Sequence, residues 1–230
     1  MPQPIRKWVP GIYFASPALD KRPKLAAGIG RVTAAWSEID VEFGILLAIL
    51  LGTQARIGVA MYLSLAGSPA QRSTLLAAAE ASALPEDMLL KIEALSEEMR
   101  TRVKERNNVV HAVWSIYPGH RDRIINCPPE NLVRDVANTY ESYARIFDIL
   151  EEPPSKEFMK ALRYYTAKDF DQIVNRIKDF KSEIMIVQNE IGLYLDAVRS
   201  LAAAQESVLR EEEALSRQEA ARTPNPSKSS

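Results

Sequence analysis

The side chains best suited to chemistry lie in one short run, from Lys104 to His111, which contains a guanidinium, two amides and an imidazole. Metal-free cleavage of RNA needs a group that titrates near neutrality to move the proton of a ribose 2′-OH. It also needs a fixed cation for the negative charge that develops on the phosphoryl oxygens. His111 and Arg106 have these properties, so we take Arg106, Asn107 and His111 as candidate catalytic residues.

The spacing of these residues restricts how they can meet. On an ideal helix, Arg106 and His111 are separated by about 140° of rotation and about 7.5 Å of rise, whereas Asn107 and His111 share a face. Arg106 could curl its long side chain toward that face, and a second copy of the helix would relax the constraint. The alternative is structural: Arg106 forms a surface ion pair, Asn107 and Asn108 fray the helix end, and His111 bonds to a hairpin carbonyl.

Apolar residues in steps of three and four predict the helices that must position this run. The first helix has its apolar stripe at Leu25, Ile29, Val32, Trp36, Ile39, Phe43, Leu46 and Leu50, and Gly52 is a plausible stop. A second helix is predicted from about Gln54 to Ala66. Gly67, Ser68 and Pro69 then supply a turn, a cap and a first-turn proline for a third.

The candidate residues lie near the end of a fourth predicted helix, which begins at Pro85 and continues to about His111. Beyond it, Ala112–Tyr117 and Asp122–Cys127 flank Pro118-Gly119 and predict a short β-hairpin.

Two further helices are predicted in the second half of the chain. Apolar residues from Leu132 to Leu150 indicate one, and a three-four alternation from Phe170 to Leu201 indicates another, with Thr166 and Asp169 as its cap. The alternation fits either a bundle helix or a dimer seam.

We therefore predict an all-α fold, a helical bundle with a short β-hairpin after the motif helix and a long C-terminal helix. Residues 1–20 form an extended Pro-rich segment, residues 21–218 the helical domain, and residues 219–230 a disordered tail. Residues 128–165 are a possible insertion in that domain.

Composition excludes several classes of function. With 29 Lys and Arg against 30 Asp and Glu, the net charge of −1 gives no global field that would attract nucleic acid or anionic lipid, so any nucleic-acid contact must be local.

Cys127 is the only cysteine, which fits a reducing compartment, and no secretory signal is visible. The longest apolar stretch, Phe43 to Leu51, is about half of the ~20 residues that cross a bilayer. We expect a cytoplasmic protein without a membrane span, and no motif predicts a metal or cofactor.

Arg106-Asn107-x-x-x-His111 resembles the R-x4-6-H motif of the HEPN superfamily, including the polar residue that often follows the arginine in its ribonuclease members. The continuation through Trp114 and the upstream run from Trp36 to Asp40 are similar to bacterial HEPN-like proteins. The resemblance covers roughly Leu25 to Cys127, with Thr166 to about Leu201 as a later bundle helix.

The resemblance implies a metal-independent endoribonuclease that dimerises, so that two motifs face one cleft, and that leaves a 2′,3′-cyclic phosphate. Such members act as toxins, defence effectors or RNA-processing factors. His111 would be the acid-base residue, Arg106 the phosphate and transition-state stabiliser, and Asn107 a positioning residue. RNA, a second copy and an antitoxin or defence protein are the implied partners. Val113 stands where a subgroup silenced by adenylylation carries tyrosine, which makes that control doubtful.

Two alternatives stay open: a non-catalytic module that binds RNA, a nucleotide or a protein, and a dimerisation or antitoxin scaffold. Near the motif, cations outnumber anions by six to two, which indicates either a local cationic surface or an ordinary solvated helix face. The six cations are Arg100, Arg102, Lys104, Arg106, Arg121 and Arg123, and the anions are Glu105 and Asp122. Trp114 and Tyr117 are expected to pack on the bundle rather than to stack on bases.

Overall fold

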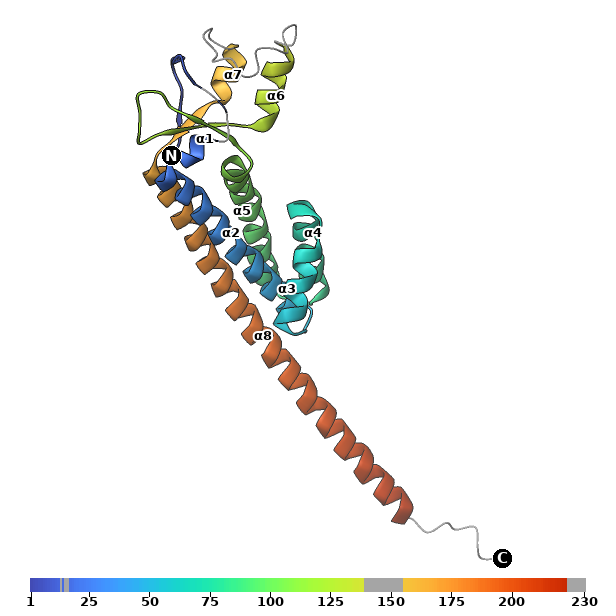
Figure 1. The fold of residues 1–230 in the computed structure, drawn as a ribbon. Coiled ribbons are helices and arrows are strands. Elements are labelled where there is room, and N and C mark those ends of the chain that lie inside the picture. Colours follow the sequence, from blue (N-terminus) through green and yellow to red (C-terminus); the bar gives the residue numbers. More distant parts are fainter. Residues whose placement is uncertain (13, 15–16, 139–154, 223–230) are drawn as a thin grey trace, which may run out of the picture.

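The structure, a computed structural model, describes residues 1–12, 14, 17–138 and 155–222 of the chain. Helices build a bundle, and a small antiparallel sheet lies across one end of it (Figure 1). In chain order the elements are β1 (Gln3–Pro4), α1 (Pro17–Asp20), α2 (Pro23–Leu50), α3 (Ala55–Ser64), α4 (Gly67–Ala81), α5 (Glu86–Val110), β2 (Val113–Ile116), β3 (Ile124–Cys127), α6 (Pro129–Asn138), α7 (Lys156–Ala161), β4 (Arg163–Tyr165) and α8 (Ala167–Arg222).

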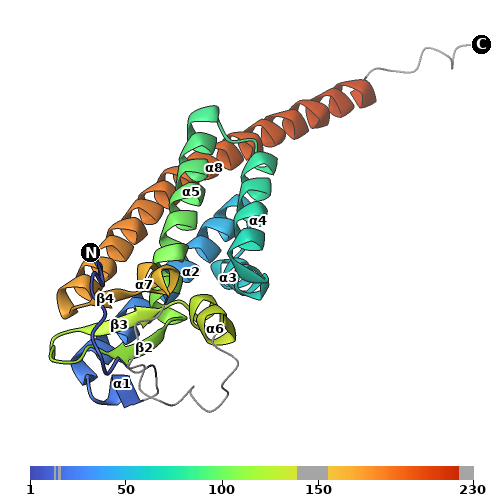
Figure 2. The same ribbon diagram turned by 90° about the horizontal axis from the view of Figure 1, so that it is seen from above.

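The core of the bundle forms where α2 packs along α8 (Figure 2). The predicted apolar stripe of α2 is buried apart from the half-buried Ile29, and that of α8 is buried from Phe170 to Ile191, whereas Val198 and Leu201 at its end are exposed. Phe43 of α2 meets Phe180 of α8 with ring centroids 5.9 Å apart. α2 ends at Leu50, two residues before the predicted stop at Gly52, and Gly52 has the left-handed backbone (φ 62°) that glycine adopts without steric cost. The apolar stretch that begins at Phe43 was expected to form a core helix, and it does, because Phe43, Leu46 and Leu47 are fully buried.

α3 crosses α2 at a very close approach. A Cβ added at Gly44 would lie 2.6 Å from the Cα of Val59, and one added at Gly58 would lie 2.5 Å from the Cβ of Ala48. No side chain fits between the two backbones here, so glycine at both positions sets the distance between the helices.

The sheet has four strands in the order β1-β4-β3-β2, and every pairing is antiparallel. The predicted hairpin is confirmed as β2 and β3, with Val113 opposite Cys127 and Ile116 opposite Ile124. The prediction of a hairpin alone was wrong, because β4 pairs with β3 and the N-terminal β1 pairs with β4. β1 and β4 have two and three residues, too few for an alternating pattern to be visible in the sequence.

The two faces of the sheet belong to different cores. Trp114, Ile124 and Tyr165 join the bundle core, whereas Ile125 and Cys127 join a smaller cluster on the other face. N-terminal residues and α7 complete that smaller cluster through Ile5, Ile12, Phe158 and Leu162. The sheet is thus a layer between the bundle and a cap made by the N-terminal segment and α7.

The remaining predicted segments agree with the structure in part. The expected helix from Leu132 to Leu150 is observed as α6 up to Asn138, and the rest lies in 139–154, outside the described residues. The possible insertion 128–165 ends in β4, an inner strand of the sheet. α8 has the predicted cap, with the Thr166 amide donating to Asp169 Oδ2 at 2.9 Å, but it continues well past Leu201 to Arg222. Residues 223–230 of the expected tail lie outside the described part.

Within the described residues, no single helix combines the length and apolarity needed to cross a membrane. α2 and α3 meet those criteria only as a pair, and they are bent by 119° relative to each other.

Substitution Gly44→Ala should lower the free energy of unfolding by about 1–3 kcal/mol, because the new methyl group meets the backbone of α3. Gly30→Ala is the matched control in the same helix. Nothing lies within 4 Å of its Cβ position, so it should raise the free energy of unfolding by about 0.5–1 kcal/mol. Urea denaturation of both variants measures the difference, and equal effects would contradict the close crossing.

Candidate functional site

The candidate residues lie where α5 ends against the sheet. α5 ends at Val110, and His111 follows as its cap residue with φ −100° and ψ 3°. The His111 amide still donates to the carbonyl of Asn107 at 3.0 Å. Asn126 of β3 donates its side-chain amide to the carbonyl of Asn108 and so ties the last turn of α5 to the sheet. The helix end is therefore fixed on both sides rather than frayed.

The structure brings the three predicted catalytic residues together. Arg106 Nη1 donates to Asn107 Oδ1 at 2.8 Å and lies 3.3 Å from His111 Nε2. Because a guanidinium can only donate, Nε2 accepts in this contact and the imidazole carries its proton on Nδ1. The side chain of Arg106 bends toward the helix face that carries Asn107 and His111. It can therefore reach His111 although residues five apart on a helix point in different directions.

The three residues differ in their exposure to solvent. His111 is exposed, while Arg106 and Asn107 are half-buried. Arg106 has no carboxylate within 4.0 Å among the described residues, so the surface ion pair of the structural alternative does not form there. Its Nε is fully buried and has no hydrogen-bond partner in the described part of the chain. The arginine is thus held in place while its Nη1 points to the imidazole.

Asp40 of α2 is a member of the site that sequence reasoning did not assign. Burial raises the pKa of Asp40, and the nearby charge of Arg106 and a hydrogen bond from Trp36 partly oppose that rise. Trp36 is itself buried at 4% exposure. Trp36 and Asp40 are four apart and share a helix face, a spacing that could have indicated the pair but not its position beside Arg106.

Three of the six cations counted around the motif are paired with carboxylates. Arg102 pairs with Glu98 at 2.5 Å and with Glu105 at 3.5 Å, Arg100 pairs with Glu97, and Arg123 lies 3.7 Å from Asp122. Glu105 also pairs with Arg176 of α8. The sequence count missed these partners because Glu97 and Glu98 lie one turn before the run and Arg176 comes from another helix.

The hairpin aromatics have mainly structural surroundings. Trp114 is buried at 7% exposure and packs edge-on against Tyr165 at 5.4 Å, which agrees with the expected packing on the bundle. Tyr117 is half-buried beside His120 and Tyr164, and Arg123 lies 4.8 Å from the centre of the Tyr164 ring.

Comparison with protein-family models, with curated proteins and with solved structures finds no match. Among the described residues, no group of three or more His, Cys, Asp or Glu side chains is placed to hold a metal ion. The functional argument therefore depends on the geometry around Arg106 and His111.

Asp40→Asn should make the folded protein more stable at neutral pH. Because the pKa of Asp40 is raised in the folded state, folding costs more once the carboxyl ionises, so stability falls as pH rises from the unfolded pKa through the folded one. The amide stays neutral and avoids that cost. Urea unfolding from pH 3.5 to pH 7 should show the advantage of the variant growing with pH.

The control is Asp179→Asn, which removes the same charge from an exposed position on α8. If Asp40→Asn loses stability at pH 7 relative to wild type, the favourable charge interaction of Asp40 with Arg106 outweighs the cost of burying its carboxylate.

Proposed function

We propose that the protein is a metal-independent endoribonuclease of the HEPN type, with Arg106, Asn107 and His111 as its catalytic residues. One observation carries this proposal: Arg106 Nη1 lies 3.3 Å from the Nε2 of an exposed imidazole and is held there by Asn107. A fixed cation and an exposed group able to exchange a proton thus lie side by side, which is the arrangement that 2′-OH attack on a phosphodiester requires.

The reaction proceeds by transfer within the RNA strand. Arg106 binds the scissile phosphate, and its donors turn from His111 to the phosphoryl oxygens, which leaves Nε2 free. His111 Nε2 accepts the proton of the 2′-OH, the 2′-oxygen forms a bond to phosphorus, and the bond from phosphorus to the 5′-oxygen breaks. The leaving 5′-oxygen takes a proton from an imidazolium, which the second copy supplies. The products are a 2′,3′-cyclic phosphate and a 5′-hydroxyl.

Asn107 and Asp40 have positioning roles in this scheme. Asn107 holds Arg106 Nη1 near the imidazole at 2.8 Å. Asp40 supplies a half-buried carboxyl near the guanidinium, because it interacts with the charge of Arg106 and accepts a hydrogen bond from Trp36. Together they keep the arginine in one orientation before substrate arrives, which lowers the cost of organising the site.

A homodimer completes the proposed site. Exposed apolar side chains recur every seven or eight residues along one face of α8, at Ile186, Leu193, Leu201, Val208 and Leu215. A helix stripe of this kind is a suitable surface for self-association. It also favours the second candidate function, a dimerisation scaffold in which the motif has no catalytic part.

His111→Ala should lower the rate of single-stranded RNA cleavage in EDTA by about 100- to 10,000-fold, because the proton acceptor is lost. Arg106→Ala should lower it by about 100- to 1,000-fold, because the developing charge loses its donor. Cleavage of a labelled oligonucleotide, with identification of the cyclic phosphate, measures both effects.

The matched control is His120→Ala, which removes the only other histidine of the chain and should leave the rate within about threefold of wild type. Circular dichroism checks the fold of all variants. Wild-type protein that binds RNA without cutting it would reject the nuclease in favour of a binding module. Self-association without RNA binding would favour the scaffold.

Co-expression with an equal amount of His111→Ala chain should reduce wild-type activity to about a quarter, because only dimers with two intact histidines supply both base and acid. If each chain works alone, about half of the activity remains instead. Cleavage rate per total chain, wild type and variant together, distinguishes the two outcomes, and co-expression with His120→Ala chain, which should keep full activity, is the control.

A further inference from the structure

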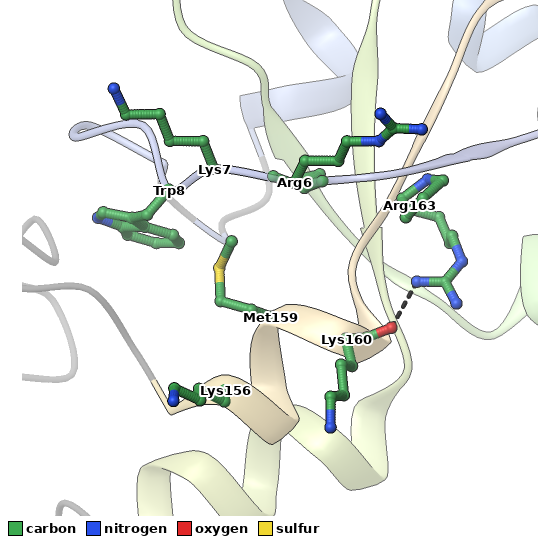
Figure 3. Close-up of a pocket in the computed structure, with 9 residues that line it drawn as sticks. Arg6, Lys7, Trp8, Lys156, Met159, Lys160 and Arg163 are labelled. Atoms are coloured by element: carbon green, nitrogen blue, oxygen red, sulfur yellow. Dashed lines mark hydrogen bonds between the residues drawn. The ribbon is translucent and has the colours of Figure 1, made fainter.

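A basic pocket of about 700 Å³ lies between the N-terminal segment and α7, apart from the catalytic motif (Figure 3). Its lining includes five cations and one large aromatic ring. They are Arg6, Lys7, Lys156, Lys160, Arg163 and Trp8. Pro4, Ile5 and Met159 complete the wall, so none of the described residues that line the pocket is acidic.

These cations are available to a ligand. None of the five has a carboxylate within 4.0 Å in the described part of the chain, in contrast to Arg100 and Arg102 of α5. Arg163 Nη1 donates to the main-chain carbonyls of Lys160 and Leu162, which fixes its guanidinium beside the pocket (Figure 3). Lys7, Lys156 and Lys160 are exposed. Five uncompensated positive charges around one hollow favour a ligand that carries several negative charges.

Trp8 adds a second type of contact. Its ring is half-buried on one side of the pocket, and its indole Nε1 is buried with no hydrogen-bond partner among the described residues. A flat aromatic face beside a row of cations is the combination with which proteins bind single-stranded nucleic acid, because bases stack on the ring and phosphates meet the cations.

The pocket and the motif are joined by the same sheet. β1 and β4 carry the pocket, and β2, at the opposite edge, begins two residues after His111. Three strand spacings separate β1 from β2, about 14 Å.

We propose that this pocket is a docking site for the sugar-phosphate backbone of single-stranded RNA, several nucleotides away from the linkage that is cut. The choice of RNA rests on the proposed ribonuclease function. The pocket contributes affinity rather than chemistry, and it explains how a protein with a net charge of −1 would hold RNA although Arg100, Arg102 and Arg123 near its motif are paired.

The first test measures binding by itself. The probe is a fluorescent 20-nucleotide RNA, and the protein carries His111→Ala so that no cleavage occurs. Adding Lys7→Ala, Lys156→Ala and Lys160→Ala should weaken binding about 100-fold at 0.1 M salt and reduce the slope of log affinity against log salt by about 2, since each lost phosphate contact removes about 0.7.

The matched control removes three positive charges from exposed positions on α8, with Lys178→Ala, Arg210→Ala and Arg217→Ala. It should change affinity by less than about threefold, although the net charge is the same. Equal weakening by both triple variants, or no RNA binding by the parent protein at low salt, overturns the proposal. Binding to anionic lipid vesicles without RNA binding also overturns it.

Two further readouts identify the site. RNA should change the tryptophan fluorescence, and Trp8→Phe should abolish the change, because Trp36 and Trp114 are buried. In cleavage, the pocket variant should raise KM for the 20-nucleotide RNA with kcat unchanged and should leave a dinucleotide substrate unaffected.

These outcomes separate the two proposals. RNA binding that depends on the pocket, without any cleavage, would reject the nuclease and keep the docking site. RNA cleavage with a KM that does not change when the three lysines are substituted would reject the docking site and keep the nuclease.

Discussion

The contact between Arg106 and His111 depends on the point at which α5 stops. If the helix continued in regular form, the two side chains would leave it in directions about 140° apart. Because the chain leaves the helix at His111, with ψ near 0°, the imidazole comes within 3.3 Å of the guanidinium. Asn126 holds the last turn from the side of the sheet. The sheet is therefore part of the site, although none of its side chains belongs to the catalytic set.

The helical bundle also supports the candidate site, through α2. α2 carries the buried stripe that packs on α8, and it also places Trp36 and Asp40 beside α5. An ionised carboxyl in such surroundings is costly unless a cation or a donor is near, and both Arg106 and Trp36 fulfil that need. The same helix thus contributes stability through its apolar face and a charge through the face that turns to Arg106.

Sequence reasoning succeeded where a pattern repeats over many residues. The helices from Leu25 to Val110 and the long last helix follow from steps of three and four, and the hairpin follows from two alternating runs around Pro118-Gly119. The reasoning failed where a structure is short or non-local. β1 and β4 are held by pairing with distant strands, so their few residues contain no visible period.

The candidate site shows the same division. Arg106, Asn107 and His111 were found because their types and spacing lie in one run. The position of Asp40 beside Arg106 and the pairing of Glu105 with Arg176 depend on which helices meet, and a single sequence does not contain that information. The local charge count was misleading for this reason: it compared neighbours in the chain rather than neighbours in space.

α8 has a mechanical consequence that follows from its length. Its 56 residues extend for about 84 Å at about 1.5 Å per residue, and its C-terminal part projects away from the bundle (Figure 1). The side chains of Val198, Leu201 and Val208 are exposed. At its other end a single residue, Thr166, joins it to β4. The free part, about 40 Å long, acts as a lever arm: a tilt of about 10° at the bundle would swing its tip by about 7 Å, so small adjustments beside the sheet are magnified at a distance.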